Sequence, residues 1–408
     1  MIPPAPQKGR GTAHNPHNRF APSHSVAEDD GWYQEVPQTQ GTEVRVETAK
    51  SVISRNTSPD LPFDRSINPY RGCEHGCIYC YARPSHAYWD LSPGLDFETK
   101  LIAKTNAAEV LAQQLSKPGY VCAPINLGSN TDPYQPIERE QLLTRRLLEV
   151  LLRFRHPVTI VTKGALVLRD LDLLAEMARQ RLVRVMISLT TLDDDLKRVL
   201  EPRAASPKAR LRAIRVLREA GVPVGVLCSP MIPMINDSEL ERLLEAAREA
   251  GAQSADYMML RLPLEVAPLF EQWLQDHYPQ RAAHVLSLIR QSRGGELYDS
   301  RFGARMRGEG VFAELLAQRF AKAMKRLEFE GREAQALDCS AFCPPGGADG
   351  TVLMLEQSTA FVGAGAPANT GAAGAMYRVA SFAGTPAPTG SAQVPGSRMR
   401  RIASPQCN

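Results

Sequence analysis

Three cysteines stand within eight residues in the segment NPYRGCEHGCIYCYAR, which spans residues 68–83. Cys73, Cys77 and Cys80 have the spacing C-x3-C-x2-C, which points to a metal centre rather than to disulfide bridges. A structural zinc site normally takes four protein ligands in two separated pairs, so three thiols leave the set one short. His75 lies inside the loop but is awkwardly placed to cap the same metal. An iron–sulfur cubane held by three thiolates keeps one iron open for chemistry, with a zinc loop or unrelated thiols as the alternatives.

The composition indicates a globular protein without a membrane anchor. Of 408 residues, 43% are hydrophobic and 23% are charged, and the net charge is +4. This weak basic excess permits an anionic substrate without demanding one. Eight cysteines are too few for a disulfide scaffold in a chain of this length. No apolar run of about 18 residues is present, so we expect no membrane span. The N-terminus lacks the apolar core of a signal peptide, so we expect a cytoplasmic location.

The chain divides into a central patterned region and two tails. Residues 1–60 are rich in Pro, His, Asn, Gln and charged side chains, which predicts a flexible or loosely docked N-terminal arm. Residues 339–408 are dominated by Gly, Ala, Pro, Ser and Thr, which predicts a low-complexity, disordered tail. Between them, residues 61–264 alternate between short strands and amphipathic helices, and residues 265–338 have the pattern of a helical extension.

This alternation predicts an α/β fold with a parallel sheet. About five or six βα units fit a partial (β/α)6-type barrel, with an open doubly wound sheet as the alternative. The expected strands cover residues 97–106, 122–130, 156–164, 183–191, 222–232 and 256–264. In both architectures the site belongs at the C-terminal ends of the strands. The residues at or just past these ends include Ser129, Asp132, Lys163, Ser188 and Ser229, and Cys73 is placed at the end of an earlier strand.

The cysteine spacing, with Tyr79 directly before Cys80, resembles the signature of radical S-adenosylmethionine (SAM) enzymes. The resemblance implies a 4Fe–4S cluster held by Cys73, Cys77 and Cys80 in loop 71–83, after the first strand of a partial β/α barrel. It also implies that SAM chelates the open iron. An electron, from a donor such as flavodoxin or ferredoxin, then cleaves SAM to a 5′-deoxyadenosyl radical that abstracts hydrogen from a substrate.

Four further segments, within about residues 65–235, resemble spore photoproduct lyase and its relatives, a DNA-repair-photolyase-like group. They are GSNTDPYQPIE, IVTKGALVLRDLDLL, ISLTTLDDDLKRVLEPRAASPKARLRAI and LCSPMIP. The rest of the chain resembles a bacterial branch of that group without an assigned substrate. The resemblance implies SAM-contacting roles for Lys163 and Ser188, with Thr131, Asp132 and Tyr79 nearby. Residue chemistry agrees, since a lysine can pair with the methionine carboxylate of SAM. A solvated lysine and a buried core hydroxyl are the alternatives.

Asn130 departs from the pattern of that group, which places a hydrogen-donating cysteine just before the Thr/Ser-Asp pair. An amide cannot return a hydrogen atom to a carbon radical, so thymine-dimer reversal by that route is not expected. Cys228, at the end of a strand, could donate a hydrogen atom in a related way, although a buried structural cysteine is the favoured interpretation. Cys339 and Cys343 stand where the tail begins and are assigned no role.

Four arginines are candidates for contact with an anionic substrate or a phosphate backbone. Arg261 interrupts an apolar strand, and a charge there usually points into a site or a buried pair. Arg301, Arg305 and Arg307 lie in one loop, where pairing with acids such as Asp299 is an equal alternative. We therefore expect a radical SAM enzyme of unidentified substrate, with nucleic acid as one candidate. The alternatives are a non-catalytic zinc- or cluster-binding nucleic-acid module and radical modification of a protein or a small molecule.

Overall fold

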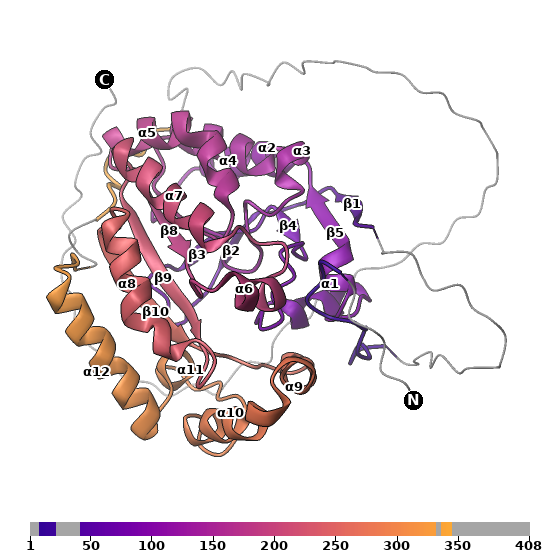
Figure 1. The fold of residues 1–408 in the computed structure, drawn as a ribbon. Coiled ribbons are helices and arrows are strands. Elements are labelled where there is room, and N and C mark those ends of the chain that lie inside the picture. Colours follow the sequence, from indigo (N-terminus) through magenta and orange to yellow (C-terminus); the bar gives the residue numbers. More distant parts are fainter. Residues whose placement is uncertain (1–7, 22–40, 332–335, 345–408) are drawn as a thin grey trace, which may run out of the picture. The chain divides into compact units, whose positions relative to one another are not determined.

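The computed structural model describes residues 8–21, 41–331 and 336–344, and its main element is a seven-stranded sheet (Figure 1). The strands are β2 (Ile53–Arg55), β3 (Arg65–Ile67), β6 (Ile125–Leu127), β7 (Val158–Thr162), β8 (Val183–Ser188), β9 (Val224–Met231) and β10 (Ser254–Met259). Their order is β10-β9-β8-β7-β6-β3-β2. Neighbours from β3 to β10 pair in parallel, and β2 pairs antiparallel with β3.

The order of the parallel strands decides between the two predicted architectures. A doubly wound sheet reverses its strand order at a switch point, whereas these six strands follow one another in chain order. The sheet is therefore the predicted partial barrel of six parallel strands, opened between β3 and β10 and extended by β2. Its strands are buried in the way that helix-covered parallel sheets require, as in β8, where Val183, Val185 and Ile187 are at most 1% exposed.

Amphipathic helices follow the strands and cover the outside of the sheet (Figure 1). They are α2 (Ala107–Leu115), α4 (Leu143–Arg153), α5 (Leu171–Arg179), α7 (Pro207–Glu219) and α8 (Leu240–Glu249). In α4, Leu147, Leu148 and Leu151 recur at helical spacing and are fully buried. Helix α7 starts at Ser206, whose hydroxyl accepts from the Ala209 backbone N at 3.2 Å, as expected of an N-cap. Shorter elements are α3 (Glu138–Gln141), α6 (Asp194–Leu200), η2 (Ala165–Asp170) and η3 (Asp237–Glu239).

A second, three-stranded sheet stands apart from the barrel strands. It contains β1 (Glu43–Glu47), β5 (Lys100–Lys104) and β4 (Tyr70–Arg71) in the order β1-β5-β4. The strand predicted within residues 97–106 is therefore present as β5 but does not belong to the barrel. Helix α1 (Asp96–Thr99) leads directly into it.

The N-terminal arm differs from its prediction wherever the structure describes it. Residues 43–47 and 53–55 are strands of the two sheets, and residues 8–21 are bound to the rest of the chain by hydrogen bonds. Composition misleads here because polar contacts hold residues 8–21, as at the buried Asn18, and because the few apolar residues further on, Ala49 and Val52, join the main apolar core. Residues 345–408, most of the predicted tail, lie outside the described residues. The start of that tail is bound: Cys343 N donates to Phe154 O at 3.1 Å.

The C-terminal extension is helical, as expected. Its helices are α9 (Val266–His277), α10 (Pro279–Gln291), α11 (Ala304–Arg307) and α12 (Gly310–Arg326). Phe270 and Trp273 of α9 belong to one apolar cluster with Ile78, so this extension supports the cysteine loop from outside the barrel. In the described ranges, no helix is long and apolar enough to cross a membrane.

Candidate active site

Loop 71–83, called the cluster loop below, connects β4 to the short helix η1 (Arg83–Trp89). Backbone hydrogen bonds anchor it: Cys73 N donates to Phe97 O at 2.8 Å, and Ile78 N donates to Leu200 O at 3.2 Å. Gly76 has a φ of +67°, and a Cβ there would lie 2.8 Å from the Glu98 carboxylate. Glycine is therefore required at this turn, which brings Cys73 and Cys77 back toward each other.

The three thiols occupy one buried place. Cys73 and Cys77 are buried, while Cys80 is partly exposed. Burial raises the pKa of Cys77 to about 12. It also raises the pKa of Cys73 well above its ordinary value, with further contributions from Asp132, Cys77 and Cys80. Thiolates at this place therefore need the positive charge of a bound metal centre.

The donor set fits a cluster better than a single ion. No group of three or more His, Cys, Asp or Glu side chains in the described part of the chain is arranged to hold one metal ion. A zinc ion needs four ligands at tetrahedral distances, whereas a cubane distributes its thiolate ligands over separate iron atoms. Three mutually close but separate thiols on one loop therefore match the ligand set of a cubane.

Asp132, predicted to lie near SAM, is instead fully engaged with protein. Its carboxylate accepts hydrogen bonds from Thr162 Oγ1 at 2.6 Å and from the Lys163 backbone N at 2.7 Å. The Tyr134 backbone N also donates to this carboxylate at 2.9 Å, and His75 Nδ1 of the cluster loop lies 3.3 Å from it. Burial would raise the pKa of Asp132, but His75 and these donors lower it to about 2. Asp132 therefore fastens the cluster loop to the end of β7.

Gln135, in the same segment, was not singled out from the sequence. Its side chain accepts from Glu74 N at 2.9 Å and donates to Gly72 O at 3.2 Å, and it is fully buried. The loop after β6 thus holds the cluster loop at two points, His75 through Asp132 and the backbone around Cys73 through Gln135. The sequence offered only a weak signal, a glutamine three residues after Asp132, because its burial is visible only in the folded structure.

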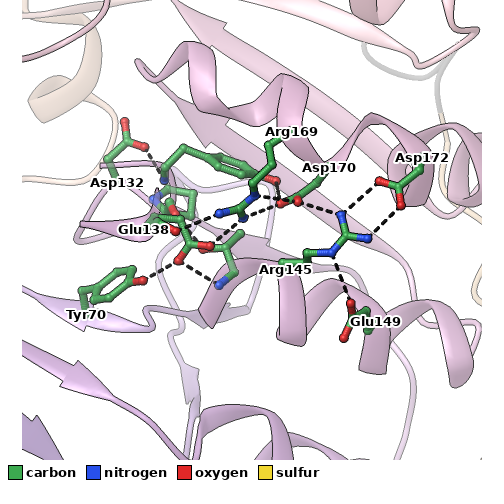
Figure 2. A network of polar contacts seen from close by, with 11 residues as sticks. Tyr70, Asp132, Glu138, Arg145, Glu149, Arg169, Asp170 and Asp172 are labelled. Atoms are coloured by element: carbon green, nitrogen blue, oxygen red, sulfur yellow. Dashed lines mark hydrogen bonds and ion pairs between the residues drawn. The ribbon is translucent and has the colours of Figure 1, made fainter. Parts of the chain in front are cut away.

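A polar network secures the far end of this loop (Figure 2). Figure 2 shows Glu138 between Tyr70 and Arg169, and Asp170 between Arg169 and Arg145. Glu138 accepts from the Tyr70 hydroxyl and from Arg169 Nη2 at 2.7 Å. Arg169 and Arg145 lie 2.8 Å and 3.1 Å from the Asp170 carboxylate. The loop after β6 is thereby fixed to β4, α4 and η2 at once.

Glu201 is the centre of a second buried network beneath the cluster loop. Its carboxylate accepts from Thr190 Oγ1 at 2.6 Å, from the Tyr79 hydroxyl and from Arg210 Nη2. Burial would raise the pKa of Glu201, but Arg210 and Lys163 lower it to about 2, so it is an anion. The Tyr79 hydroxyl is therefore hydrogen-bonded to Glu201 and lies near Thr190, so it does not face an open site.

Lys163 places a positive charge at this site. It follows β7, and its ammonium lies 5.7 Å from the centre of the Tyr79 ring. Burial would lower the pKa of Lys163, but Cys77 and Glu201 raise it, so the side chain is charged. Ser188 ends β8, is buried, and donates to Ser229 O at 3.3 Å. Lys163 is thus close to the thiols, whereas Ser188 lies deeper in the strand ends.

Thr131 and Asn130 occupy the rim of β6. Thr131 is buried, and its hydroxyl donates to Tyr70 O at 3.3 Å. Asn130 is held by its backbone N, 2.8 Å from Asn68 Oδ1, and by its amide, which donates to Ser85 Oγ at 3.1 Å. Cys228 is fully buried within the main apolar core, which matches the structural interpretation of that cysteine.

A buried ion pair connects the N-terminal arm to the cluster loop. Arg83 donates from Nε to Cys77 O at 3.0 Å and pairs with Glu98. Glu98 in turn accepts from Gly11 N at 2.8 Å and from Thr12 N at 3.2 Å. Neither the arm nor this pair was predicted as part of the site, because no local motif marks contacts between residues so far apart in the chain.

The four candidate arginines divide into two groups. Arg301, Arg305 and Arg307 each pair with a carboxylate: Asp299 at 2.6 Å, Asp60 at 2.6 Å and Asp256, respectively. These three therefore match the paired-loop alternative. Arg261 instead lies over the ring of Tyr81, at 4.9 Å from its centre. Because Tyr81 directly follows Cys80, Arg261 alone of the four stands beside the cluster loop.

Comparisons with known proteins agree with this geometry. Residues 67–247 match the family model described as the Radical SAM superfamily. An uncharacterized protein of Mycobacterium tuberculosis is 35% identical over 298 residues, which are 72% of this chain and 84% of that protein. One of Methanocaldococcus jannaschii is 28% identical over 232 residues, 57% of this chain and 82% of that protein.

Solved structures share the fold. Spore photoproduct lyase complexed with dinucleoside spore photoproduct has a TM-score of 0.50 and 16% identity, and covers 70% of this chain and 79% of that chain. A mutant of that lyase with bound AdoMet and dinucleoside spore photoproduct has the same TM-score and identity, over 70% and 78% of the two chains.

Proposed function

Because the chain belongs to the radical SAM superfamily, whose members use a 4Fe–4S cluster and SAM, we propose that Cys73, Cys77 and Cys80 hold the cluster. When bound and reduced, the cluster supplies the electron that cleaves SAM to methionine and a 5′-deoxyadenosyl radical. The observation that carries the proposal is the set of three close thiols on one loop, two of them buried and the third partly exposed. The other site residues, taken in turn below, are proposed to bind SAM or to position the cluster loop.

Lys163 is the proposed partner of the methionine carboxylate of SAM. Its support is its charge and its position beside Cys77 and Glu201 at the end of β7. Ser188 and Thr131 are proposed as hydroxyl contacts at neighbouring strand ends. For Asp132 and Tyr79 we propose positioning roles, because their polar atoms are already satisfied by His75, Thr162 and Glu201.

Nucleic acid is the substrate class that we propose first, acted on in a soluble compartment with a small redox protein as the electron donor. Its support is the exposed aromatic side chains around the cluster loop, which can stack with bases: Tyr81, Tyr88 and Trp89. Arg71 lies 3.8 Å from the Trp89 ring centre and is paired with Glu47 at 2.8 Å, so it adds a stacking surface rather than free charge. Modification of a protein or a small molecule is the second candidate, favoured by the lack of a cysteine at position 130.

The test is anaerobic reconstitution with iron and sulfide, followed by reduction with dithionite in the presence of SAM. We expect a brown protein that forms 5′-deoxyadenosine, and loss of both properties in Cys73→Ala, Cys77→Ala and Cys80→Ala. Cys122→Ser is the matched control, because Cys122 precedes β6 and so lies at the opposite end of the strands. A colourless protein that holds zinc and forms no deoxyadenosine would overturn the proposal.

Adding oligonucleotides to the active protein tests the substrate class. We expect single-stranded DNA or RNA to increase deoxyadenosine formation, in a way that weakens as salt is raised. If a peptide or small-molecule pool stimulates the reaction and oligonucleotides do not, the second candidate replaces the first.

A further inference from the structure

Arg261 stands at the mouth of the barrel, just beyond the last strand. The strand β10 ends at Met259, and Leu260 N still donates to Met231 O at 3.0 Å. The backbone at Arg261 is therefore held by the neighbouring strand β9. Its guanidinium is fixed over the Tyr81 ring at 4.9 Å and near the Tyr298 ring at 6.0 Å.

The hydrogen-bonding capacity of this guanidinium is largely unused. Arg261 Nη1 lies 3.7 Å from Met306 Sδ, a weak acceptor, and Nη2 lies 3.4 Å from the Tyr298 hydroxyl. Its Nε is buried and has no hydrogen-bond partner among the described residues. No ion pair joins Arg261 to a carboxylate in the described ranges, in contrast to Arg301 and Arg305. A half-buried charge with an orphaned donor calls for a ligand.

A second arginine adds to the positive field. Arg293 is buried and donates to Ala304 O at 2.6 Å and to Leu260 O at 2.7 Å. Its pKa is lowered to about 10, first by burial and then by the neighbouring charge of Arg261. Asp299 opposes this effect, but its carboxylate is already bound by Arg301 at 2.6 Å. The two guanidiniums therefore leave an excess of positive charge at this place.

Tyr81 places this charge next to the chemistry. It directly follows Cys80, and its hydroxyl donates to Ser129 O at the rim of β6. The Arg261 guanidinium lies over its ring, at 4.9 Å from the ring centre. Tyr81 therefore connects Arg261 to the loop that carries the three cysteines.

We propose that Arg261, with Tyr81 and Tyr298, forms a subsite beside the cluster loop that binds an oxyanion of the substrate. This inference rests on the proposed function for the identity of the neighbouring reaction, and it adds that the substrate carries a phosphate or carboxylate group. The planar fork of arginine suits either group, because both present two oxygens to paired N–H donors. Aromatic rings beside the fork would hold the uncharged part of the substrate.

Relaxation of small anions in the presence of the reduced, paramagnetic holoprotein tests the subsite. The probes are inorganic phosphate and a thymidine dinucleotide for the phosphate arm, observed by ³¹P resonance, and ¹³C-labelled acetate and a dipeptide for the carboxylate arm. We expect saturable relaxation enhancement for one arm, with an affinity at least about tenfold weaker in Arg261→Gln, since charge-assisted hydrogen bonds are the strong ones. Arg261→Lys should be intermediate, because it keeps the charge but loses the fork.

Arg301→Gln is the matched control, because it removes the same charge from an exposed, carboxylate-paired position in the same region. It should leave the anion affinity within about twofold of the wild type. Enhancement of phosphate alone assigns a phosphorylated substrate, and enhancement of acetate alone assigns a carboxylate. Equal affinities in wild type and Arg261→Gln, or no saturable enhancement by either arm, overturn the subsite. Deoxyadenosine formation from SAM alone is followed in parallel, so that a wild type without this reaction fails the proposed function and not the subsite.

Discussion

The Arg83 guanidinium and the Glu98 carboxylate form an ion pair of 2.5 Å in which neither side chain is exposed to solvent. Arg83 also donates to the carbonyl of Cys77, and Glu98 also accepts from the backbone of Gly11 and Thr12. The Arg83–Glu98 pair thus connects the N-terminal arm to Cys77, one of the proposed cluster ligands. The pair makes the arm part of the wall of the site.

Removing one member of this pair should destabilise the protein strongly. In Glu98→Leu, Arg83 keeps a buried charge without its partner, which costs about 3–5 kcal/mol. We expect a corresponding loss in the free energy of unfolding and a lower iron content after reconstitution. Denaturant titration and iron analysis measure these. Arg179→Met, which breaks the exposed pair with Glu176, is the control and should cost less than about 1 kcal/mol. Equal losses in the two variants would contradict a special role for Arg83 and Glu98.

The arm should be displaced by a single methyl group. A Cβ on Gly11 would lie 1.7 Å from Gly76 O, a backbone atom of the cluster loop that cannot move freely. We expect Gly11→Ala to expose residues 8–21 to limited proteolysis and to speed the bleaching of the reconstituted cluster in air. Gly41→Ala is the matched control, because a Cβ on Gly41 meets nothing within 4 Å. Unchanged proteolysis and bleaching in Gly11→Ala would show that the arm is not packed as described.

Glu201 and Arg210 should behave as a unit. Glu201→Leu leaves Arg210 buried and unpaired, and we expect a loss of about 3–5 kcal/mol in the free energy of unfolding. Replacing both residues by leucine should recover most of that loss, since a buried ion pair can often be exchanged for apolar side chains. The double variant should leave Lys163 charged, because Glu201 raises the pKa of that lysine and Arg210 lowers it, so that removing both leaves opposing effects. A double variant as unstable as Glu201→Leu alone would contradict this coupling.

The barrel and the cluster loop could be predicted because their signals are local. The spacing of Cys73, Cys77 and Cys80 is visible in one short segment, and strands such as β7 and β8 have a buried, β-branched pattern. The first barrel strand, β3, has only the residues Arg65–Ile67 and was not among the expected strands. The choice of barrel over open sheet followed from the resemblance, and the strand order now decides it. Lys163 could be proposed because its segment, IVTKGALVLRDLDLL, resembles the strand of the related group that ends in Thr-Lys.

The contacts that position the site could not be predicted, because they join residues far apart in the chain. Arg83 is adjacent to the cluster loop, but its partner Glu98 and the arm at Gly11 are identified only by the folded structure. Asp132 was expected near SAM, yet its carboxylate is consumed by His75 and by the end of β7. A sequence shows that a polar residue follows a strand, but it does not show which groups form hydrogen bonds with the side chain of that residue.

His156 should make the stability of the protein depend on pH. Burial, and then the neighbouring charge of Arg65, lowers the pKa of His156 to about 4. Its Nε2 lies 2.9 Å from the Tyr120 hydroxyl and its Nδ1 lies 3.0 Å from Pro157 O, which suits a neutral ring. The unfolded chain binds a proton near pH 6.5 and the folded chain does not until about pH 4. The stabilisation is therefore complete above about pH 6.5 and is lost as the pH falls toward 4.

The difference in unfolding free energy between wild type and His156→Gln isolates this effect, because every other titrating group, including His86 with its pKa lowered to about 4, is common to both proteins. Between pH 7.5 and 5.0 we expect the wild type to lose about 2 kcal/mol more than the variant. Anaerobic denaturant titrations of the reconstituted proteins at the two pH values measure it. A gap that stays constant would mean that the folded protein protonates His156 as readily as the unfolded chain does, and that the Tyr120 contact does not require a neutral ring.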